Sequence, residues 1–451
     1  MMENLKKVSR AQWCLFAFLI GFTFLMQNCS DDDGIIYEEN QIKTELNARP
    51  VKVTICRYNE RKGTYSEVTV VEKRVLPGDV IIDADGDGYA AYNECGVLIG
   101  NGIDCDDTNA AINPGAVEIC GDGIDNDCNG EIDECTYVPD DKFELTLISN
   151  GYDDTLDNYV FNKNINTVKY LNVNYYEGYS PGKIADLTGI GGFTALETLE
   201  CKYNQLTSLN VSNNTALNSL FCDYNQLTSL DVSNNTSLAW LYCGVNQLAS
   251  IDVSKNKALK LFSCSVNQLT SLDVSNNTAL EGLYFSENKL SGINLSANTS
   301  LITLHANNNQ LTSLDVSSNN ALDILYCWSN DLETINVSNN PNLIDFYCYD
   351  NQLTSLDVSS NTNLYYLYCS NNLLTSVDLS NNAALEGLWI DNNQLTSLDV
   401  SQNTALEYLE CFNNAALGCI QVNISQLATA PTDPNWIKDE PAVYSTDCSS
   451  Y

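Results

Sequence analysis

The sequence predicts a mainly β solenoid with two columns of strands, preceded by a small, acidic loop module. A 21-residue unit recurs eleven times between residues 196 and 414, and a fixed period of this size is typical of stacked repeats. Within each unit, two short segments alternate inward apolar residues with outward ones, as strands do. Ahead of the repeats, carboxylates crowd into a stretch that has no basic residue.

Each unit reads L-x-x-L-x-C-x-x-N-x and then L-x-x-L-D-V-S-x-N-x-x, so halves of ten and eleven residues are nested within the 21. Alternation sends Leu220 and Cys222 to one face and Phe221 to the other. One repeat cannot bury its leucines alone, but stacked repeats form a continuous apolar core. The unit resembles bacterial leucine-rich repeats with alternating halves. That resemblance implies a curved solenoid that binds other macromolecules.

The turns and the cysteines of the repeat are interpreted as structural. Two asparagine columns, one containing Asn225 and the other Asn235, are expected to satisfy turn backbone groups and each other. Eight cysteines share one slot of the repeat, which also accepts Phe285, Ala306 and Ile390. A ligand role would not tolerate these replacements, whereas free Cys behaves as a small buried hydrophobe. We therefore expect reduced thiols in the core.

Residues 1–28 are predicted to be a lipoprotein signal peptide. A basic start precedes an apolar run from Trp13 to Met26, which is too short to span a bilayer comfortably. Cys29 and an acidic run from Asp31 to Asp33 follow. This arrangement resembles surface lipoproteins of the Bacteroidetes and implies lipidation of Cys29. The expected location is the outer membrane or cell surface, an exported environment that permits disulfides.

Residues 79–136 are expected to form a calcium-binding loop module. Sixteen Asp and Glu residues lie between Asp79 and Asp140 with no Lys or Arg, and so many carboxylates repel one another unless a cation enters. The first loop has the ligand spacing of an EF-hand calcium loop. Its candidate ligands are Asp83, Asp85, Asp87, the carbonyl of Tyr89, and Glu94.

Two partial loops follow the complete one. The second lacks the Gly at its sixth position, and the third has Thr136 at position 12, where Asp133 or Glu134 would have to substitute. Calcium is the expected ion, because the only His of the chain is His305, far away in the repeats. From Asp83 to Glu134 the segment resembles a metal-binding repeat of secreted bacterial proteins. The candidate ligands are Asp104, Asp106 and Asp107 in the second loop and Asp125, Asp127 and Asn129 in the third.

Caps are expected at both ends of the solenoid. Degenerate repeat halves precede it, and the period breaks after Asn414, where Cys419 and Cys448 are expected to form a disulfide. The connectivity of the cysteines near the N-terminus stays open. The expected segments are 1–28 (signal peptide), 29–78 (linker with a possible hairpin), 79–136 (calcium loops), 142–195 (N-terminal cap), 196–414 (repeats) and 415–451 (C-terminal cap).

The outward position of the first strand column is mostly aromatic. With strands about 4.8 Å apart, the aromatic strip would run for roughly 50 Å. Stacking of this kind stabilises a sheet, but a long exposed aromatic strip also marks a binding surface, and we favour binding. The second column exposes Asp231 and its equivalents, interpreted as a solvated face. The predicted ligand face consists of Phe221, Tyr242, Tyr284, Tyr326, Tyr347, Tyr368 and Trp389.

An enzyme is not expected, because the chain has one His, no nucleophile-elbow motif and no phosphate-binding Gly loop. A net charge of −37 opposes nucleic-acid binding. The favoured interpretation is a surface-anchored adhesin-like or receptor-like protein that recognises a protein ligand, with a lipid as its only membrane contact. The alternatives are a glycan-capture lipoprotein, with sugars stacked on the rings, and an architectural envelope protein.

Overall fold

The computed structural model describes residues 52–59, 64–71, 80–83, 85–89 and 103–449. The chain forms two compact units, the first made of residues 1–116 and 126–129 and the second of residues 117–125 and 130–451. The expected signal peptide, the lipidation site Cys29 and the ligand Glu94 lie outside the described residues. Among the residues that are described, no helix is long and apolar enough to cross a membrane.

The first unit contains a three-stranded antiparallel sheet in the order β2-β1-β3. Its strands are β1 (Lys52–Asn59), β2 (Thr64–Val71) and β3 (Val80–Asp83). The first two strands pair in register along their whole length, so these alternating segments do form a hairpin. A disulfide joins Cys105 to Cys128 in the same unit.

The second unit begins with a cap of short elements. They are β4 (Cys135–Tyr137), α3 (Asp141–Ser149), β5 (Tyr159–Phe161), α4 (Asn162–Ile165) and the 3-10 turn η2 (Ile190–Gly192). Asp140 begins α3, because one carboxylate oxygen accepts from the backbone N–H groups of Lys142 and Phe143. The other oxygen accepts from two amides of the chain before η2, at 2.8 and 3.0 Å. This one side chain therefore ties the helix to the loop that leads into the repeats.

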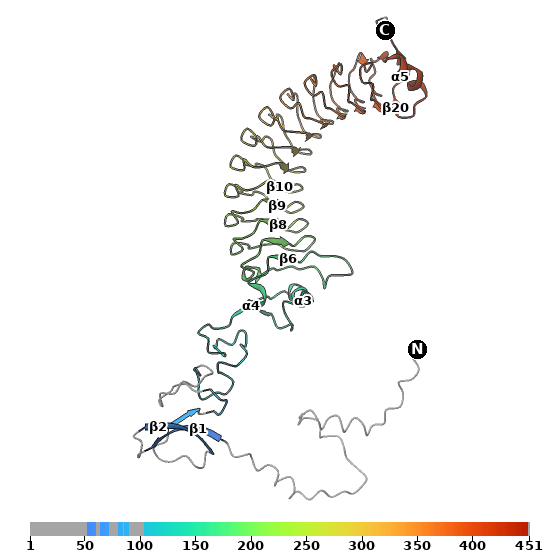
Figure 1. Cartoon of the computed structure of the whole chain (residues 1–451). Helices are drawn as coiled ribbons and strands as arrows, with labels where there is room; N and C mark the ends of the chain where they lie inside the picture. Colours follow the sequence, from blue (N-terminus) through green and yellow to red (C-terminus); the bar gives the residue numbers. More distant parts are fainter. Residues whose placement is uncertain (1–51, 60–63, 72–79, 84, 90–102, 450–451) are drawn as a thin grey trace, which may run out of the picture. The chain divides into compact units, whose positions relative to one another are not determined.

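The predicted solenoid is confirmed. Its coils stack in a curved row, with a thirteen-stranded parallel sheet along the inner side (Figure 1). In each three-residue strand the middle side chain is buried, and Leu220 and Cys222 are fully buried while Phe221 is half-buried, as the alternation predicts. The strands are β6 (Tyr170–Asn172), β7 (Thr198–Glu200), β8 (Ser219–Phe221), β9 (Trp240–Tyr242), β10 (Leu261–Ser263), β11 (Gly282–Tyr284), β12 (Thr303–His305), β13 (Ile324–Tyr326), β14 (Asp345–Tyr347), β15 (Tyr366–Tyr368), β16 (Gly387–Trp389), β18 (Tyr408–Glu410) and β20 (Trp436–Ile437).

The second column is mostly extended chain rather than hydrogen-bonded strand. Within the described residues it has isolated bridges, such as Asn210 with Asp231, and a short sheet at the C-terminal end made of β17 (Leu398–Asp399), β19 (Cys419–Gln421) and β21 (Val443–Ser445). The carboxylate of Asp231 accepts from the N–H of Ser233 at 2.9 Å, so this turn takes up an amide that a ladder would otherwise use. Leu230 and Val232 are buried as expected.

The C-terminal cap covers the last coil with α5 (Ile424–Thr429), the 3-10 turn η3 (Ala430–Thr432) and the strands β19 to β21. The side-chain amide of Gln426 donates to the carbonyls of Val400 and Asn403, at 3.2 and 2.9 Å. It therefore serves the last coil as the asparagines serve the earlier ones. Cys419 and Cys448 form the disulfide that the sequence suggested.

Both asparagine columns cross from coil to coil, but they do so through backbone groups. Asn225 donates to the carbonyls of Cys201 and Cys222, at 2.9 and 3.1 Å, and its oxygen accepts from the amide of Leu206. Asn235 donates to the backbone carbonyls of the previous coil, while its side-chain oxygen is buried without a partner. The expectation that neighbouring side-chain amides would satisfy each other is therefore wrong.

Replacing Asn351 with Ala should lower the free energy of unfolding by roughly 3 kcal/mol, because buried backbone groups of three residues lose their partners. Asn351 donates to Cys327 and Cys348 and accepts from the amide of Leu332. Asn363→Ala, at an exposed turn, is the matched control and should change stability by no more than about 0.5 kcal/mol. Urea unfolding of both variants measures the difference, and equal losses would contradict a structural role for this column.

Candidate functional site

The inner sheet carries a continuous stack of aromatic rings, here called the aromatic stack. Its members stand at the outward position of consecutive strands, from β11 to β16. Neighbouring ring centroids lie 3.9 to 4.7 Å apart. A separate pair, Phe221 and Tyr242, stacks at 5.0 Å. The aromatic stack consists of Tyr284, His305, Tyr326, Tyr347, Tyr368 and Trp389.

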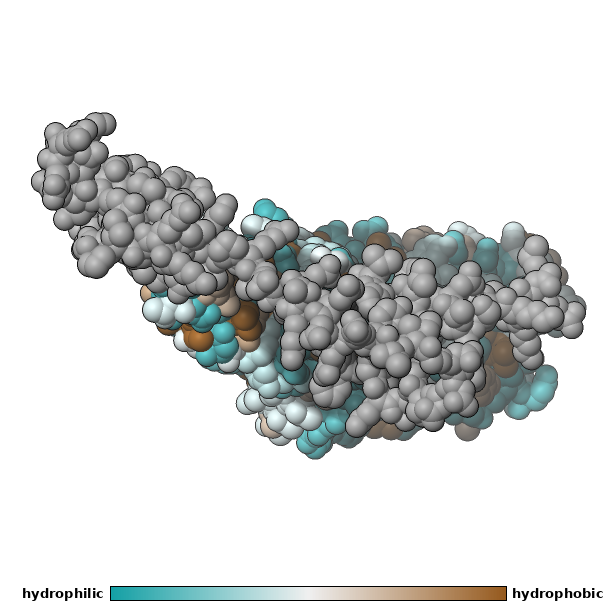
Figure 2. Space-filling model, turned by 90° about the horizontal axis from the view of Figure 1, so that it is seen from below, coloured by the Kyte–Doolittle hydropathy of each residue, from teal (hydrophilic) through white to brown (hydrophobic). Residues whose placement is uncertain are grey.

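Three of the five neighbouring pairs in the stack lie face to face, whereas Tyr347 and Tyr368 are tilted by 48° and Tyr284 meets His305 edge-on at 69°. Tyr368 and Trp389 lie at an interplanar angle of 5°, and Tyr326 and Tyr347 at 17°. Each of these side chains is half-buried, so the surface presents mainly ring edges and hydroxyl groups. The flanking rings of Trp240 and Tyr408 are more open, at 40% and 41% exposure. Over the coloured surface of the space-filling view, hydrophobic residues form separate patches among hydrophilic ones (Figure 2).

The stack is electrically neutral at pH 7, but an acidic pair lies beside it. Burial lowers the pKa of His305 to about 4, so this ring carries no charge. Burial and then the neighbouring Asp323 carboxylate raise the pKa of Asp345. Burial raises the pKa of the Tyr326 and Tyr347 phenols, and the Asp345 carboxylate contributes to this rise. The middle of the sheet therefore combines apolar ring edges with negative charge.

The Asp column on the opposite face holds turns together. In all seven repeats that have this Asp, the carboxylate accepts from the backbone N–H of the Ser two residues later. Donation by the Ser317 hydroxyl and amide lowers the pKa of Asp315. These carboxylates are exposed and already engaged, which favours the structural interpretation made from the sequence.

The acidic loop after β3 wraps around the carboxylate of Asp83. The backbone N–H groups of Gly86 and Gly88 donate to its two oxygens at 2.7 and 3.2 Å, and both glycines adopt the positive φ that the turn requires. Asp85, Asp87 and Asp83 each offer an oxygen within 4.8 Å of the others. The loop therefore gathers three carboxylates at one point.

Asp104, in a different segment of the same unit, is near enough to be repelled by Asp85 and Asp87, although it is not one of the three residues whose oxygens lie within 4.8 Å of one another. Asp104 is 1% exposed. Burial raises the pKa of its carboxyl group, and repulsion from Asp87, Asp85 and another nearby carboxylate raises it further. One oxygen accepts from the amide of Asp106, but Oδ2 is buried without a hydrogen-bond partner. Asp85 and Asp87 each have an Oδ2 in the same state. Three orphaned carboxylate oxygens fit a hard cation, which takes oxygen ligands.

The other predicted ligands mostly serve the local backbone. Asp106 accepts from the amide and hydroxyl of Thr108, Asp125 from the amide of Gly130, and Asp127 from the amide of Asn129. Asp107 contributes to the raised pKa of Asp104, and the Tyr89 amide donates to Asp87. Asp133, considered as a substitute ligand in the third loop, instead accepts from the amides of Gly121 and Gly123.

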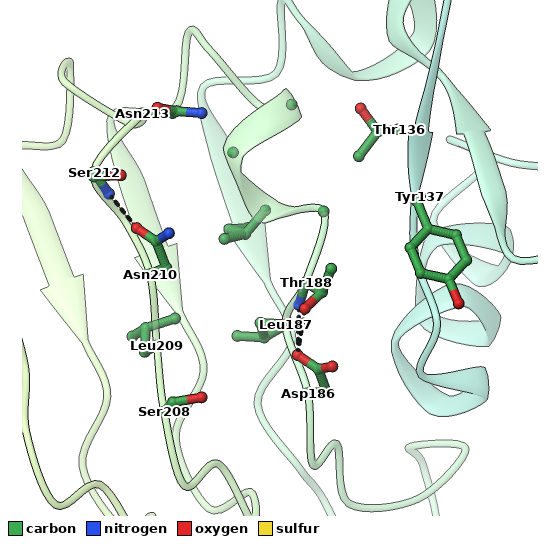
Figure 3. Close-up of a pocket in the computed structure, with 14 residues that line it drawn as sticks. Thr136, Tyr137, Asp186, Leu187, Thr188, Ser208, Leu209, Asn210, Ser212 and Asn213 are labelled. Carbon is green, nitrogen blue, oxygen red and sulfur yellow. Dashed lines mark hydrogen bonds between the residues drawn. The ribbon is translucent and has the colours of Figure 1, made fainter. Parts of the chain in front are cut away.

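A cavity of about 370 Å³ lies where the N-terminal cap meets the first repeats (Figure 3). Asp186 is the only carboxylate among its lining residues, and it accepts from the amide of Thr188 at 2.8 Å. Asn210 likewise accepts from the amide of Ser212 at 3.1 Å. The polar groups at the rim are thus used within their own turns. The cavity does not bring together an acid, a base and a nucleophile.

Comparison with known proteins supports a metal-binding motif and the fold. Residues 104–134 match a family model described as “Putative metal-binding motif”. This segment begins at Asp104 and does not include the loop at Asp83. No curated protein matches the chain.

Several solved structures are similar to the solenoid. A leucine-rich-repeat protein of Leptospira interrogans is 24% identical over 58% of this chain and 74% of its own, with a TM-score of 0.51. An internalin of Listeria monocytogenes is 20% identical over 69% and 97%, also at 0.51. These two show that the solenoid has the leucine-rich-repeat fold. The functional domain of InlJ from Listeria monocytogenes, described as including a cysteine ladder, is 30% identical over 67% and 80%, at 0.46.

Two features of the site have no signal in the sequence. Asp104 approaches the first loop because the chain reverses its direction between them, and no repeat or turn motif in the sequence indicates this reversal. The acidic pair beside the stack arises because Asp323 and Asp345 occupy different positions of consecutive repeats, so neither belongs to a column. The aromatic stack itself follows directly from the 21-residue period.

The eight repeat cysteines should resist thiol reagents in the folded protein at pH 8. All eight are free and buried, and burial, with a further contribution from Asp439, raises the pKa of Cys411 to about 12. A thiol this weakly ionised is a poor nucleophile. Alkylation followed by peptide mapping should find these cysteines labelled only after unfolding. Rapid labelling of Cys264 or Cys348 in the native state, or disulfides between neighbouring coils, would contradict this interpretation.

Proposed function

We propose that the chain is an exported, surface-attached binding protein whose inner sheet recognises a protein ligand. The observation that carries this proposal is the aromatic stack, which runs across six consecutive strands on the side where the solenoid curves inward. Aromatic side chains are enriched among the residues that dominate binding energy at protein interfaces. The lipid attachment at Cys29 and a bacterial outer-membrane or cell-surface location belong to the same proposal, on the strength of the N-terminal sequence.

The stacking geometry favours a protein over a glycan. A sugar binds an aromatic side chain by lying flat on its open face. In three neighbouring pairs of the stack these faces are occupied by the adjacent ring, with centroids as close as 3.9 Å between Tyr368 and Trp389. What remains are edges and phenol hydroxyls, which pack against side chains and accept or donate hydrogen bonds. Asp323 and Asp345 add negative charge, so the proposed ligand presents basic side chains to the centre of the sheet.

We further propose that the first acidic loop binds calcium, with Asp83, Asp85, Asp87 and Asp104 as ligands. The support is the all-oxygen donor set and the three buried oxygens without a partner. Calcium would neutralise part of the acidic segment from Asp79 to Asp140, which contains no Lys or Arg. Its role would be to hold the chain at Asp104 against the loop after β3, which stabilises the module. Catalysis is not part of the proposal.

Changing Tyr326, Tyr347 and Tyr368 together to Phe should weaken ligand binding while the solenoid stays folded, because Phe preserves the ring stack and removes only the hydroxyls. Changing the same three to Ser should weaken binding further, since truncation of an interface hot spot costs about 2 kcal/mol or more, roughly thirtyfold in Kd. The ligand would be captured from cell-surface protein extracts and titrated by surface plasmon resonance.

The matched control changes Asp315, Asp357 and Asp378 to Asn on the opposite face. This variant should bind normally, because these carboxylates only cap turns. Circular dichroism and thermal unfolding check that each variant is folded. Loss of binding in the Asn variant together with normal binding in both tyrosine variants would assign the ligand to the other face. The glycan alternative predicts instead that a glycan array is positive and that Trp240→Ala or Tyr408→Ala abolishes the signal.

Calcium should bind the full chain with a Kd of about 0.1–1 mM, the range of extracellular modules. Asp87→Asn removes one charge and one ligand oxygen, and it should weaken this binding at least about tenfold. Asp122→Asn is the control, because the Asp122 carboxylate accepts from the amide of Ile124 and lies outside the cluster. Isothermal titration calorimetry measures both. Absence of a binding heat at several millimolar calcium would refute the site.

A further inference from the structure

The N-terminal cap of the solenoid contains a buried carboxylate that the mechanism of ligand recognition does not use. Glu144 projects from α3 and is 0% exposed. One of its oxygens, Oε1, accepts from the backbone amides of Asp157 and Asn158 at 2.7 and 2.6 Å. The other oxygen, Oε2, is buried and has no hydrogen-bond partner. Half of this carboxylate therefore organises the loop before β5, and the other half is unsatisfied.

The loop before β5 contains a second carboxylate that has one oxygen buried without a hydrogen-bond partner. Asp153 accepts from the amide of Asp154 through Oδ1, whereas its Oδ2 is buried without a partner. Burial raises the pKa of Asp153, and the carboxylates of Glu144, Asp157 and Asp154 raise it further. Glu144 and Asp153 are thus close enough to repel each other, and each has one orphaned oxygen.

Two like charges with orphaned oxygens require a positive partner, because burying an unpaired charge is strongly unfavourable. Among the described residues, neither Glu144 nor Asp153 takes part in an ion pair. A bound cation, or a proton on Asp153, would balance the charge.

We propose that Glu144 and Asp153 hold a divalent cation of the calcium type in the cap of the solenoid. Carboxylate oxygens from two segments, completed by backbone carbonyls and water, are an ordinary ligand set for calcium. Asp153 lines a cavity of about 280 Å³. Asp154, Asp157 and Glu118 also line this cavity, so its walls attract cations.

The site is separate from the loop at Asp83. It lies between helix α3 and the loop that leads into β5, whereas the loop follows β3 in the other unit. Its two proposed ligands also lie outside residues 104–134, which match the metal-binding motif, although Glu118 of that segment lines the same cavity. A cation here would fix residues 153–158 against α3, next to the start of the repeats. Calcium would then stabilise the cap on which the first coil is built.

The test uses the full chain with Asp85→Asn and Asp87→Asn, so that a failure of the calcium loop does not affect the outcome. This background should still bind one calcium ion by isothermal titration calorimetry, and calcium should raise its thermal midpoint. Adding Glu144→Gln, or separately Asp153→Asn, should remove both effects. Asp141→Asn, an exposed change in α3 outside the lining of this cavity, should leave both unchanged.

Measurements in EDTA separate a lost ligand from a misfolded variant. The side-chain oxygen of Gln can still accept from the two loop amides and no longer repels Asp153, so Glu144→Gln should have a higher midpoint than the background without calcium. Retention of the calcium response in both the Glu144 and Asp153 variants would overturn the proposal. So would a background that binds no calcium and instead loses stability as the pH rises through the raised pKa of Asp153, which would indicate a shared proton.

Discussion

The structure depends on backbone groups at the turns that only a neighbouring coil can satisfy. Asn225 shows the arrangement, because its amide donates to carbonyls of its own coil and the previous one, while its oxygen accepts from the amide of Leu206. A buried peptide group without a partner is costly, so a shift of one residue between coils would lose several such bonds at once. The positive φ of the residue before each of these asparagines, such as Tyr224 at 57°, belongs to the same turn.

Fixed register places equivalent residues above one another, and this determines both faces of the solenoid. Leu220 and its equivalents form the core. The slot of Cys222 also holds Phe, Ala or Ile in other repeats, because burial is its main requirement and the thiol adds only one weak hydrogen bond, to the carbonyl of Tyr242 at 3.3 Å. The outward position brings rings to within stacking distance. The aromatic stack therefore stabilises the sheet and forms its surface simultaneously. These two roles are compatible, since stacking uses the faces of the rings and leaves their edges to solvent or to a ligand.

The sequence predicted the repeats and some local features, such as the disulfide between Cys419 and Cys448, but it did not predict contacts between carboxylates of distant segments. The period determined the solenoid, the buried cysteines and the aromatic column. Fewer residues of the second column pair as strands than the sequence predicted. Asp231 and its equivalents form local turns, in which the carboxylate accepts from the backbone N–H of the Ser two residues later. The convergence of Asp104 on the loop at Asp83 and the burial of Glu144 in the cap come from chain reversals without a motif. Each depends on one carboxylate meeting another from a distant position, which spacing along the chain does not reveal.

The distribution of charge supports the proposal that the inner sheet binds the ligand. The chain carries a net charge of −37, and on the turn side its carboxylates are exposed and solvated. In the stack, rings without charge replace them over six strands, so a partner can approach there without displacing the water of many carboxylates. Asp323 and Asp345 place negative charge beside the middle of this strip. A partner with a basic group at the matching position would gain orientation from this pair and contact area from the rings, and its association would weaken as salt screens the pair.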